Sequence, residues 1–314
     1  MINRILIRIK VIQMVYAYLL NSGKSPIQAL EDFKRSFDKT YELYHYLLLL
    51  MVDLTDKQEE ILEDAKHKFL PTEEDLNPNM KFVNNQFIVA LREDEQFKDF
   101  VEKNGITWRN DEIFLRLMLH KVTHSQVYAD YMAAETTSLE EDCQLWSSLF
   151  RQVIMNDEHL AEVLEEKSAL WNNESEIVSQ FVLKVMSAVA RGLKQPLLPK
   201  FKPARYADEE SDEDFAYRLF ESAVAQIDEN NTIIDKHITK RWDVERVAIM
   251  DRVIMSVCIT EMREFPNIPI VVSINEYVNL AKFYSTEKSD NFVNGVLSQV
   301  LLQLKDEHKI LPRK

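Results

Sequence analysis

Glycine is almost absent from this chain, since only 4 of its 314 residues are glycine. Sheets, hairpins and barrels use glycine at tight turns and bulges, whereas a glycine inside a helix weakens it. The chain is rich instead in Leu, Glu, Lys, Ala and Met, which are strong helix formers. The sequence therefore predicts an all-α protein, and its length suffices for one large or two ordinary domains.

Apolar residues recur with the helical period in ten stretches, separated by segments that contain Gly, Pro or Asn. The predicted helices span residues 2–20, 27–66, 82–102, 111–134, 139–165, 174–193, 213–238, 242–263, 274–284 and 290–306. The clearest linker is segment 194–214, which places three prolines before an acidic run. Helix 2–20 is apolar almost all round, and this predicts burial on several sides.

The charge of the chain is negative overall and unevenly distributed. A net charge of −14 argues against a protein that binds nucleic acid over its whole surface. Residues 1–24 hold four basic residues and no acid, so we expect an anion-binding surface to involve this end. The two cysteines, Cys143 and Cys258, do not form a disulfide scaffold and indicate the cytoplasm. The longest apolar run, 46–52, is too short to span a membrane.

No catalytic motif is present in the sequence. A P-loop, a dinucleotide-binding glycine pattern, a nucleophile elbow and a Cys-x-x-Cys pair are all missing. His120 and His124 lie one helical turn apart, a spacing that can bind zinc, but there is no zincin Glu and no third ligand. We therefore expect a binding protein, not an enzyme, without metal or cofactor.

The last predicted helix contains Gly295, which costs about 1 kcal/mol relative to alanine inside a helix. Gly295 and its polar neighbours Asn294 and Ser298 lie opposite the apolar stripe of this helix. One explanation is close approach by a polar chain such as nucleic acid. The other is a second helix that crosses at Gly295, which the apolar Leu302 on the same face would suit. Both stay open at this point.

Two helix starts carry capping signals. Ser273 and Glu276 have the spacing of a capping box and predict the start of helix 274–284. Ser289 is a predicted cap for the last helix.

Three passages resemble the NusB family of bacterial transcription antitermination factors. Two passages resemble the most diagnostic sequence motifs of the family: "IPIVVSINEYVNLAK" (268–282) and "FVNGVL" (292–297). A third passage, "RILIRIKVIQMVYAYLL" (4–20), is similar to the first helix of the family. The resemblance covers residues 1–24 and 212–304. It implies a discontinuous NusB-like domain, residues 1–24 and 206–314, split by an inserted helical module, residues 25–205, of unknown role. Helix 2–20 should then pack against the C-terminal helices.

The resemblance also implies a function. NusB proteins bind the boxA element of leader and ribosomal RNA together with the ribosomal protein NusE, and they join an antitermination complex on RNA polymerase. The implied RNA-binding residues are Arg4, Arg8, Lys282, Lys288, Phe292 and Asn294, beside the Gly295 face. The implied NusE-binding residues are Tyr16, Glu245 and Asp251. Lys10 departs from the family pattern. Lys288 stands where many members have an acid, and a lysine favours phosphate binding.

Three other functions compete with antitermination. A ribosome-assembly or rRNA-maturation factor would associate with pre-ribosomal RNA without any effect on terminator readthrough. NusB-like domains also occur fused to rRNA cytosine methyltransferases, but the helical, glycine-poor remainder lacks the Rossmann-like domain that such an enzyme needs. A purely structural helical adaptor would have no affinity for RNA.

Overall fold

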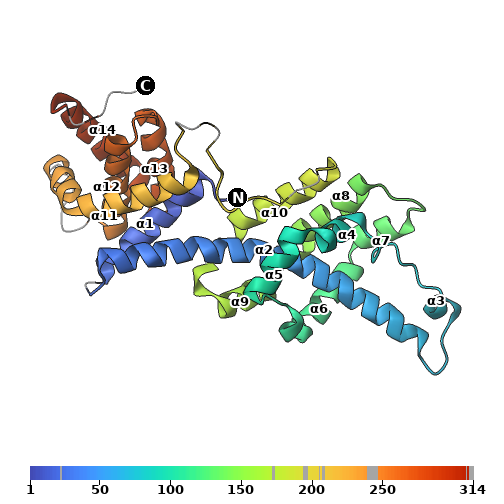
Figure 1. Ribbon diagram of the computed structural model, residues 1–314. Helices are drawn as coiled ribbons and strands as arrows, with labels where there is room; N and C mark the ends of the chain where they lie inside the picture. Colours follow the sequence, from blue (N-terminus) through green and yellow to red (C-terminus); the bar gives the residue numbers. More distant parts are fainter. Residues whose placement is uncertain are drawn as a thin grey trace. The chain divides into compact units, whose positions relative to one another are not determined.

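The computed structural model describes residues 1–21, 23–171, 174–193, 197–204, 206, 209–238, 247–308 and 310. Within these residues the regular elements are helices, with one isolated parallel bridge between Ile2 and Phe201 (Figure 1). The all-α prediction is confirmed. The α-helices are α1 (Arg4–Leu20), α2 (Pro26–Lys66), α3 (Glu73–Leu76), α4 (Gln86–Glu93), α5 (Glu95–Asn104), α6 (Glu112–Thr123), α7 (Gln126–Ala133), α8 (Leu139–Leu149), α9 (Glu158–Lys167), α10 (Ser175–Ala190), α11 (Asp212–His237), α12 (Ile249–Glu264), α13 (Ile270–Tyr284) and α14 (Ser289–Asp306).

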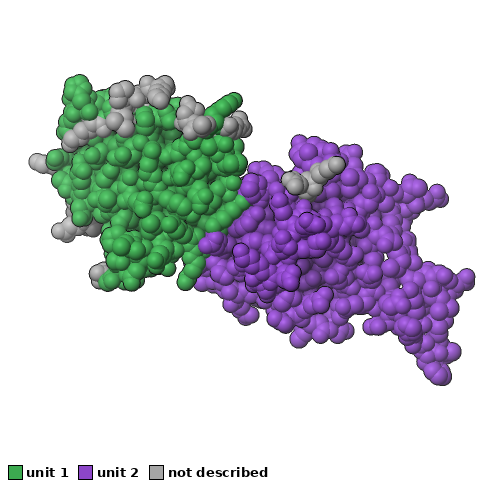
Figure 2. Space-filling model, in the orientation of Figure 1, with its two compact units in different colours: residues 1–37, 200–314 green, residues 38–199 purple. Residues whose placement is uncertain are grey.

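The chain forms two compact units (Figure 2). Unit 1 contains residues 1–37 and 200–314, and unit 2 contains residues 38–199. Helix α2 is one uninterrupted helix whose first residues belong to unit 1. A division at residues 24/25, as the sequence predicts, would assign the whole of α2 to the second unit.

In unit 1, helix α1 packs against α11 and α12, and α12 packs against α13 and α14. The prediction that the first helix meets the C-terminal helices is confirmed. The start of α2 joins this core through aromatic contacts, since the ring of Phe33 stacks on Phe220 with centroids 4.4 Å apart. The ring of Phe37 meets Phe201 edge-on at 5.1 Å.

Unit 2 has its own core of aromatic and buried polar groups. The indole of Trp108 stacks on Tyr46 at 4.2 Å, and its Nε1 donates to the Tyr46 carbonyl at 2.8 Å. Asp142 is fully buried at the start of α8 and accepts hydrogen bonds from Tyr131 Oη at 2.6 Å and from Gln86 N at 2.8 Å. This carboxylate therefore ties together the ends of α4, α7 and α8.

Three long predicted helices of unit 2 are broken. The predicted helix 82–102 divides at Asp94, which ends α4 and accepts a hydrogen bond from Phe97 N at the start of α5. The predicted helix 111–134 divides at Ser125, which caps α7. The predicted helix 139–165 ends at Leu149, passes through a π-helical turn and restarts after Asp157. In each case a short polar side chain satisfies the backbone N–H groups of a new helix start.

Both predicted caps at the C-terminal helices are wrong. Helix α13 begins at Ile270 after Pro269, so Ser273 lies inside it, where its hydroxyl donates to Glu261 at 2.7 Å. Helix α14 follows Lys288, and Ser289 is its first residue. A proline fixes the backbone angle φ that a helix start requires, and this outweighs the capping pattern three residues later. Part of the predicted helix 242–263 lies outside the described residues, and α12 begins at Ile249.

Candidate nucleic-acid interface

Arg8 lies in the interior of unit 1, not on its surface. Its side chain is 5% exposed, and its guanidinium Nε and NH2 each donate to the Glu261 carboxylate at 2.8 Å. Glu261 also accepts hydrogen bonds from the hydroxyls of Ser273 and Tyr277, at 2.7 and 2.9 Å. Burial lowers the pKa of Arg8, but the bonds and charge of Glu261 outweigh it and raise the pKa above its ordinary value. In this placement Arg8 holds α1 to α12 and has no open face for a phosphate.

The other cations near the N-terminus are also engaged. Lys10 is buried, and its amine donates to the Ser36 carbonyl at 3.2 Å. Lys24 forms an ion pair with Asp32. The excess positive charge of residues 1–24 is therefore largely bound by neighbouring groups, because tertiary contacts bring acids and carbonyls to it.

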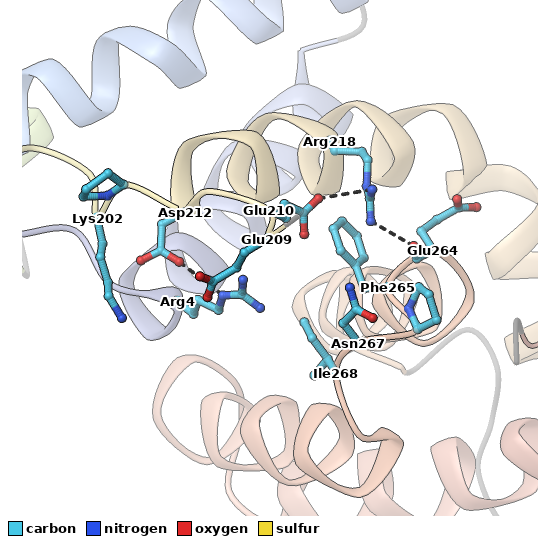
Figure 3. A pocket seen from close by; sticks show the side chains of 12 residues that line it. Arg4, Lys202, Glu209, Glu210, Asp212, Arg218, Glu264, Phe265, Asn267 and Ile268 are labelled. Carbon is cyan, nitrogen blue, oxygen red and sulfur yellow. Dashed lines mark hydrogen bonds and ion pairs between the residues drawn. The ribbon is translucent and has the colours of Figure 1, made fainter. Parts of the chain in front are cut away.

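Arg4 borders an open groove in unit 1 (Figure 3). Its side chain is 34% exposed, its Nε donates to Asp212 at 3.2 Å, and its guanidinium lies 4.6 Å from the centre of the Phe215 ring. The groove has a volume of about 720 Å³. Its charged lining residues are Arg4, Lys202, Arg218, Glu209, Glu210, Asp212 and Glu264. Four carboxylates against three cations make this groove a poor site for a phosphate chain.

Lys282 and Lys288 lie at one end of the hairpin that α13 and α14 form. Both side chains are exposed, and neither has an ion-pair partner among the residues that the structure describes. Lys288 has φ 72°, in the left-handed region where an L-residue other than Gly, Asn or Asp is strained. A lysine at this position lowers the stability of the backbone. Its amine is exposed to solvent.

Gly295 and Asn294 lie on the exposed face of α14. A Cβ built on Gly295 meets no atom within 4 Å. A crossing helix at Gly295, one of the two explanations for this glycine, is therefore not present in the described part of the chain. Leu302 on the same helix is also uncovered, with 56% of its surface exposed.

Phe292 lies in the core of unit 1, where only 7% of its surface is exposed. It cannot offer a ring face to a base in this conformation. The exposed aromatic residue at this end of the hairpin is Phe283, with 77% exposure. The sequence held a signal for it, because Phe283 falls about 120° from Tyr277 on the helical wheel, away from the apolar face of α13.

Of the three residues implied for NusE binding, the structure describes Tyr16 and Asp251. Tyr16 on α1 is half-buried. Asp251 is 4% exposed, and its Oδ2 accepts a hydrogen bond from Ser289 at 3.0 Å. Burial raises the pKa of this carboxyl, and hydrogen bonds from Ser285 and Ser289 oppose the rise. Asp251 therefore ties the start of α12 to the α13–α14 loop. Glu245 lies outside the described residues.

His120 and His124, the pair with zinc-binding spacing, stack on each other with ring centroids 3.8 Å apart. Among the described residues, no three His, Cys, Asp or Glu side chains come together as a metal site. No described helix is long and apolar enough to cross a membrane.

Comparison with known proteins shows which family the C-terminal half resembles. Residues 176–302 match the NusB family. The chain contains a NusB-family domain.

Three curated relatives share the name transcription antitermination protein NusB. The relative from Salinibacter ruber is 37% identical over 103 residues, which cover 33% of this chain and 64% of the relative. The relative from Chloroherpeton thalassium is 38% identical over 30% of this chain and 44% of its own length. The relative from Natranaerobius thermophilus is 40% identical over 28% of this chain and 66% of its own length.

The chain thus spans about half to two thirds of the length of these NusB relatives. No solved structure matches the chain. The NusB match begins inside α10, which belongs to unit 2, and ends inside α14. Helix α1 lies outside the match but packs against the matched helices α11 and α12. Residues 1–175 are additional to the match, and most of unit 2 falls within them.

Proposed function

We propose that this protein is an RNA-binding transcription antitermination factor of the cytoplasm. In this proposal it binds single-stranded RNA of the boxA type, together with the ribosomal protein NusE, as part of an antitermination complex on RNA polymerase. The relatives that carry the name transcription antitermination protein NusB support the general role. The proposal goes beyond that general role when it specifies a boxA-type RNA sequence, NusE as a partner and a complex on RNA polymerase. It includes no enzymatic step.

The observation that carries the proposal is the uncovered polar face of α14 beside two lysines, Lys282 and Lys288, that have no ion-pair partner among the described residues. A bare backbone at Gly295 and the amide of Asn294 allow a strand to come close and hydrogen-bond. Since neither lysine pairs with an acid in the described part of the chain, each can meet a phosphate without first losing such a pair. Arg4 is a secondary candidate, because Asp212 already holds its Nε. Arg8 and Phe292 act from the interior and support the surface instead of contacting RNA.

The charge of the whole chain predicts weak binding in isolation. A net charge of −14 repels RNA at long range, and four cations of the N-terminal segment are already engaged. We therefore expect NusE, a basic partner, to raise the affinity of the protein for RNA. Tyr16 and Glu245 are the proposed contacts with NusE, and Asp251 supports that region from inside.

The Lys288→Asn variant tests the RNA surface. Asparagine tolerates the left-handed backbone better than lysine does, so the variant should fold at least as well as the native chain. Removing one phosphate contact should lower the slope of log affinity against log salt by about 0.7 for a single strand. Binding is measured by fluorescence anisotropy with a labelled boxA-type RNA, with and without NusE. Lys305→Asn, which removes an exposed lysine near the far end of α14, is the control. An unchanged slope in Lys288→Asn would remove this surface from the proposal.

A second experiment separates antitermination from ribosome assembly. Terminator readthrough is measured on a reporter transcript that carries boxA, in cells with and without the protein. We expect readthrough to fall when the protein is depleted and to be restored by the native chain. Association with pre-ribosomal RNA while readthrough stays unchanged would instead indicate an assembly factor. A Glu245→Lys chain that still co-purifies with NusE at the native yield would remove Glu245 from the partner surface.

A further inference from the structure

Phe283 is an uncovered aromatic side chain in a unit that fully or partly buries its other described phenylalanines. Of the described phenylalanines of unit 1, it is the one that is exposed, at 77% of its surface. Full burial of a side chain of this size stabilises a fold by roughly 1.5–3 kcal/mol, and the chain forgoes that gain here. Phe292, nine residues later, is packed into the core. The fold therefore places one phenylalanine inside and leaves the other in solvent.

The residues around Phe283 on the helix surface are amides and a lysine. Asn279 and Asn275 lie one and two helical turns before it, within about 80° of its direction at 100° per residue, and both are exposed. Lys282 precedes it and is also exposed. The outward face of α13 thus continues the polar, uncovered surface of α14, to which a four-residue loop connects it.

The charges near this face are too few to bind RNA by attraction alone. Glu276, on the same side of α13, is turned toward Arg8 with 3.9 Å between the charged atoms. Glu287 and Asp290 flank Lys288 and offset part of its charge. Much of the affinity must therefore come from contacts with bases. Single-stranded RNA supplies unstacked bases, which proteins bind with aromatic faces and with hydrogen bonds to the base edges.

We propose that Phe283 is the residue on which this protein stacks a base of single-stranded RNA, with Asn279 and Asn275 bonding to neighbouring base edges. The inference rests on the proposed RNA-binding function and names a contact outside the implied set of residues. The two turns before Phe283 expose amides, which can hydrogen-bond to the edges of unstacked bases.

The test compares Phe283→Ala and Phe283→Leu with the native full-length chain. Binding of labelled uridine and adenosine 12-mers is measured by fluorescence anisotropy over a range of salt, with NusE present. Stacking on one aromatic residue is worth about 5- to 150-fold in affinity, so Phe283→Ala should weaken binding at least about fivefold. Phe283→Leu should weaken it similarly, because leucine keeps the apolar surface but lacks a ring face. Neither variant should change the salt slope, since a ring neutralises no phosphate.

Leu302→Ala is the matched control, because Leu302 is an exposed apolar residue of the neighbouring helix and should leave affinity unchanged. A 2-aminopurine placed along the RNA gives a direct signal, since its fluorescence is quenched when it stacks on an aromatic ring. That quenching should disappear in Phe283→Leu.

The outcomes separate this inference from the proposed function. If the native chain binds RNA and Lys288→Asn lowers the salt slope, but both Phe283 variants bind like the native chain, the stacking role is wrong and the RNA-binding function stands. If the Phe283 variants lose NusE binding while RNA affinity is unchanged, the surface belongs to a protein partner and the inference is overturned. If the native chain has no RNA affinity with or without NusE, both proposals fail. A loss of thermal stability in both variants would show that the ring is packed, which also contradicts the inference.

Discussion

Replacing Arg8 by alanine should destabilise unit 1 strongly, and any loss of RNA binding should follow from that. Glu261 is fully buried, and Arg8 gives it two of its four hydrogen bonds and its charge partner. Removing one member of a buried, hydrogen-bonded ion pair costs about 3–5 kcal/mol, because the other charge stays buried without compensation. Domains have a total free energy of unfolding of about 5–15 kcal/mol, so Arg8→Ala should leave unit 1 close to unfolding.

Hydrogen exchange followed by mass spectrometry is the appropriate assay, since a chain with two units does not unfold in one step. Peptides from α1 and α12 should lose protection in Arg8→Ala, whereas peptides from α8 and α10 in unit 2 report whether the loss is local. Arg4→Ala is the control, because Arg4 is about one third exposed and its pair with Asp212 should contribute less than about 1 kcal/mol.

A double variant separates charge burial from lost packing. Arg8→Met combined with Glu261→Gln keeps an acceptor for Ser273 and Tyr277 and leaves no buried charge, so it should recover at least half of the lost stability. The reasoning is refuted if Arg8→Ala costs less than about 1 kcal/mol and at the same time lowers the RNA salt slope by about 0.7. That result would mean that the guanidinium contacts RNA.

Three further predictions concern single positions. Gly295→Ala should raise the free energy of unfolding of unit 1 by about 1 kcal/mol in a denaturant titration, because alanine favours the helix and its Cβ meets no atom; a decrease would show that the backbone at this site is packed. Gly295→Leu should keep the helix content seen by circular dichroism but lower RNA affinity at least tenfold, and native affinity would exclude close approach of the strand. Burial raises the pKa of Asp53 from 3.8 to about 6, with the Trp108 N–H opposing the rise. Protonation therefore favours the folded state, and unit 2 should gain up to about 3 kcal/mol as the pH falls from about 7 to 4. Asp53→Asn should remove that pH dependence, and an identical pH profile for native and variant chains would contradict this assignment.

The sequence alone predicted most of the helical segments and the burial of α1. Scarcity of glycine and the period of the apolar residues are local properties, and they predicted the positions of α1, α2 and α11 to within one or two residues. Two of the three passages that resemble NusB, residues 268–282 and 292–297, lie inside the matched region, whereas the passage in α1 lies outside it. The apolar circumference of α1 predicted its burial, and the resemblance predicted its contact with the C-terminal helices. Each of these features depends on a pattern of residues that lie within a few helical turns of one another.

Only the tertiary structure decided which polar and aromatic residues face solvent. The sequence alone gives Arg8 the character of a surface cation. The structure pairs it with Glu261, which lies 253 residues away in the chain. Phe292 and Phe283 are two phenylalanines near one loop, and the packing of α13 and α14 on the core buries the first and exposes the second. A helical pattern fixes the direction of a side chain relative to its own helix. Whether another helix lies in that direction depends on contacts between residues distant in sequence, which no local pattern encodes.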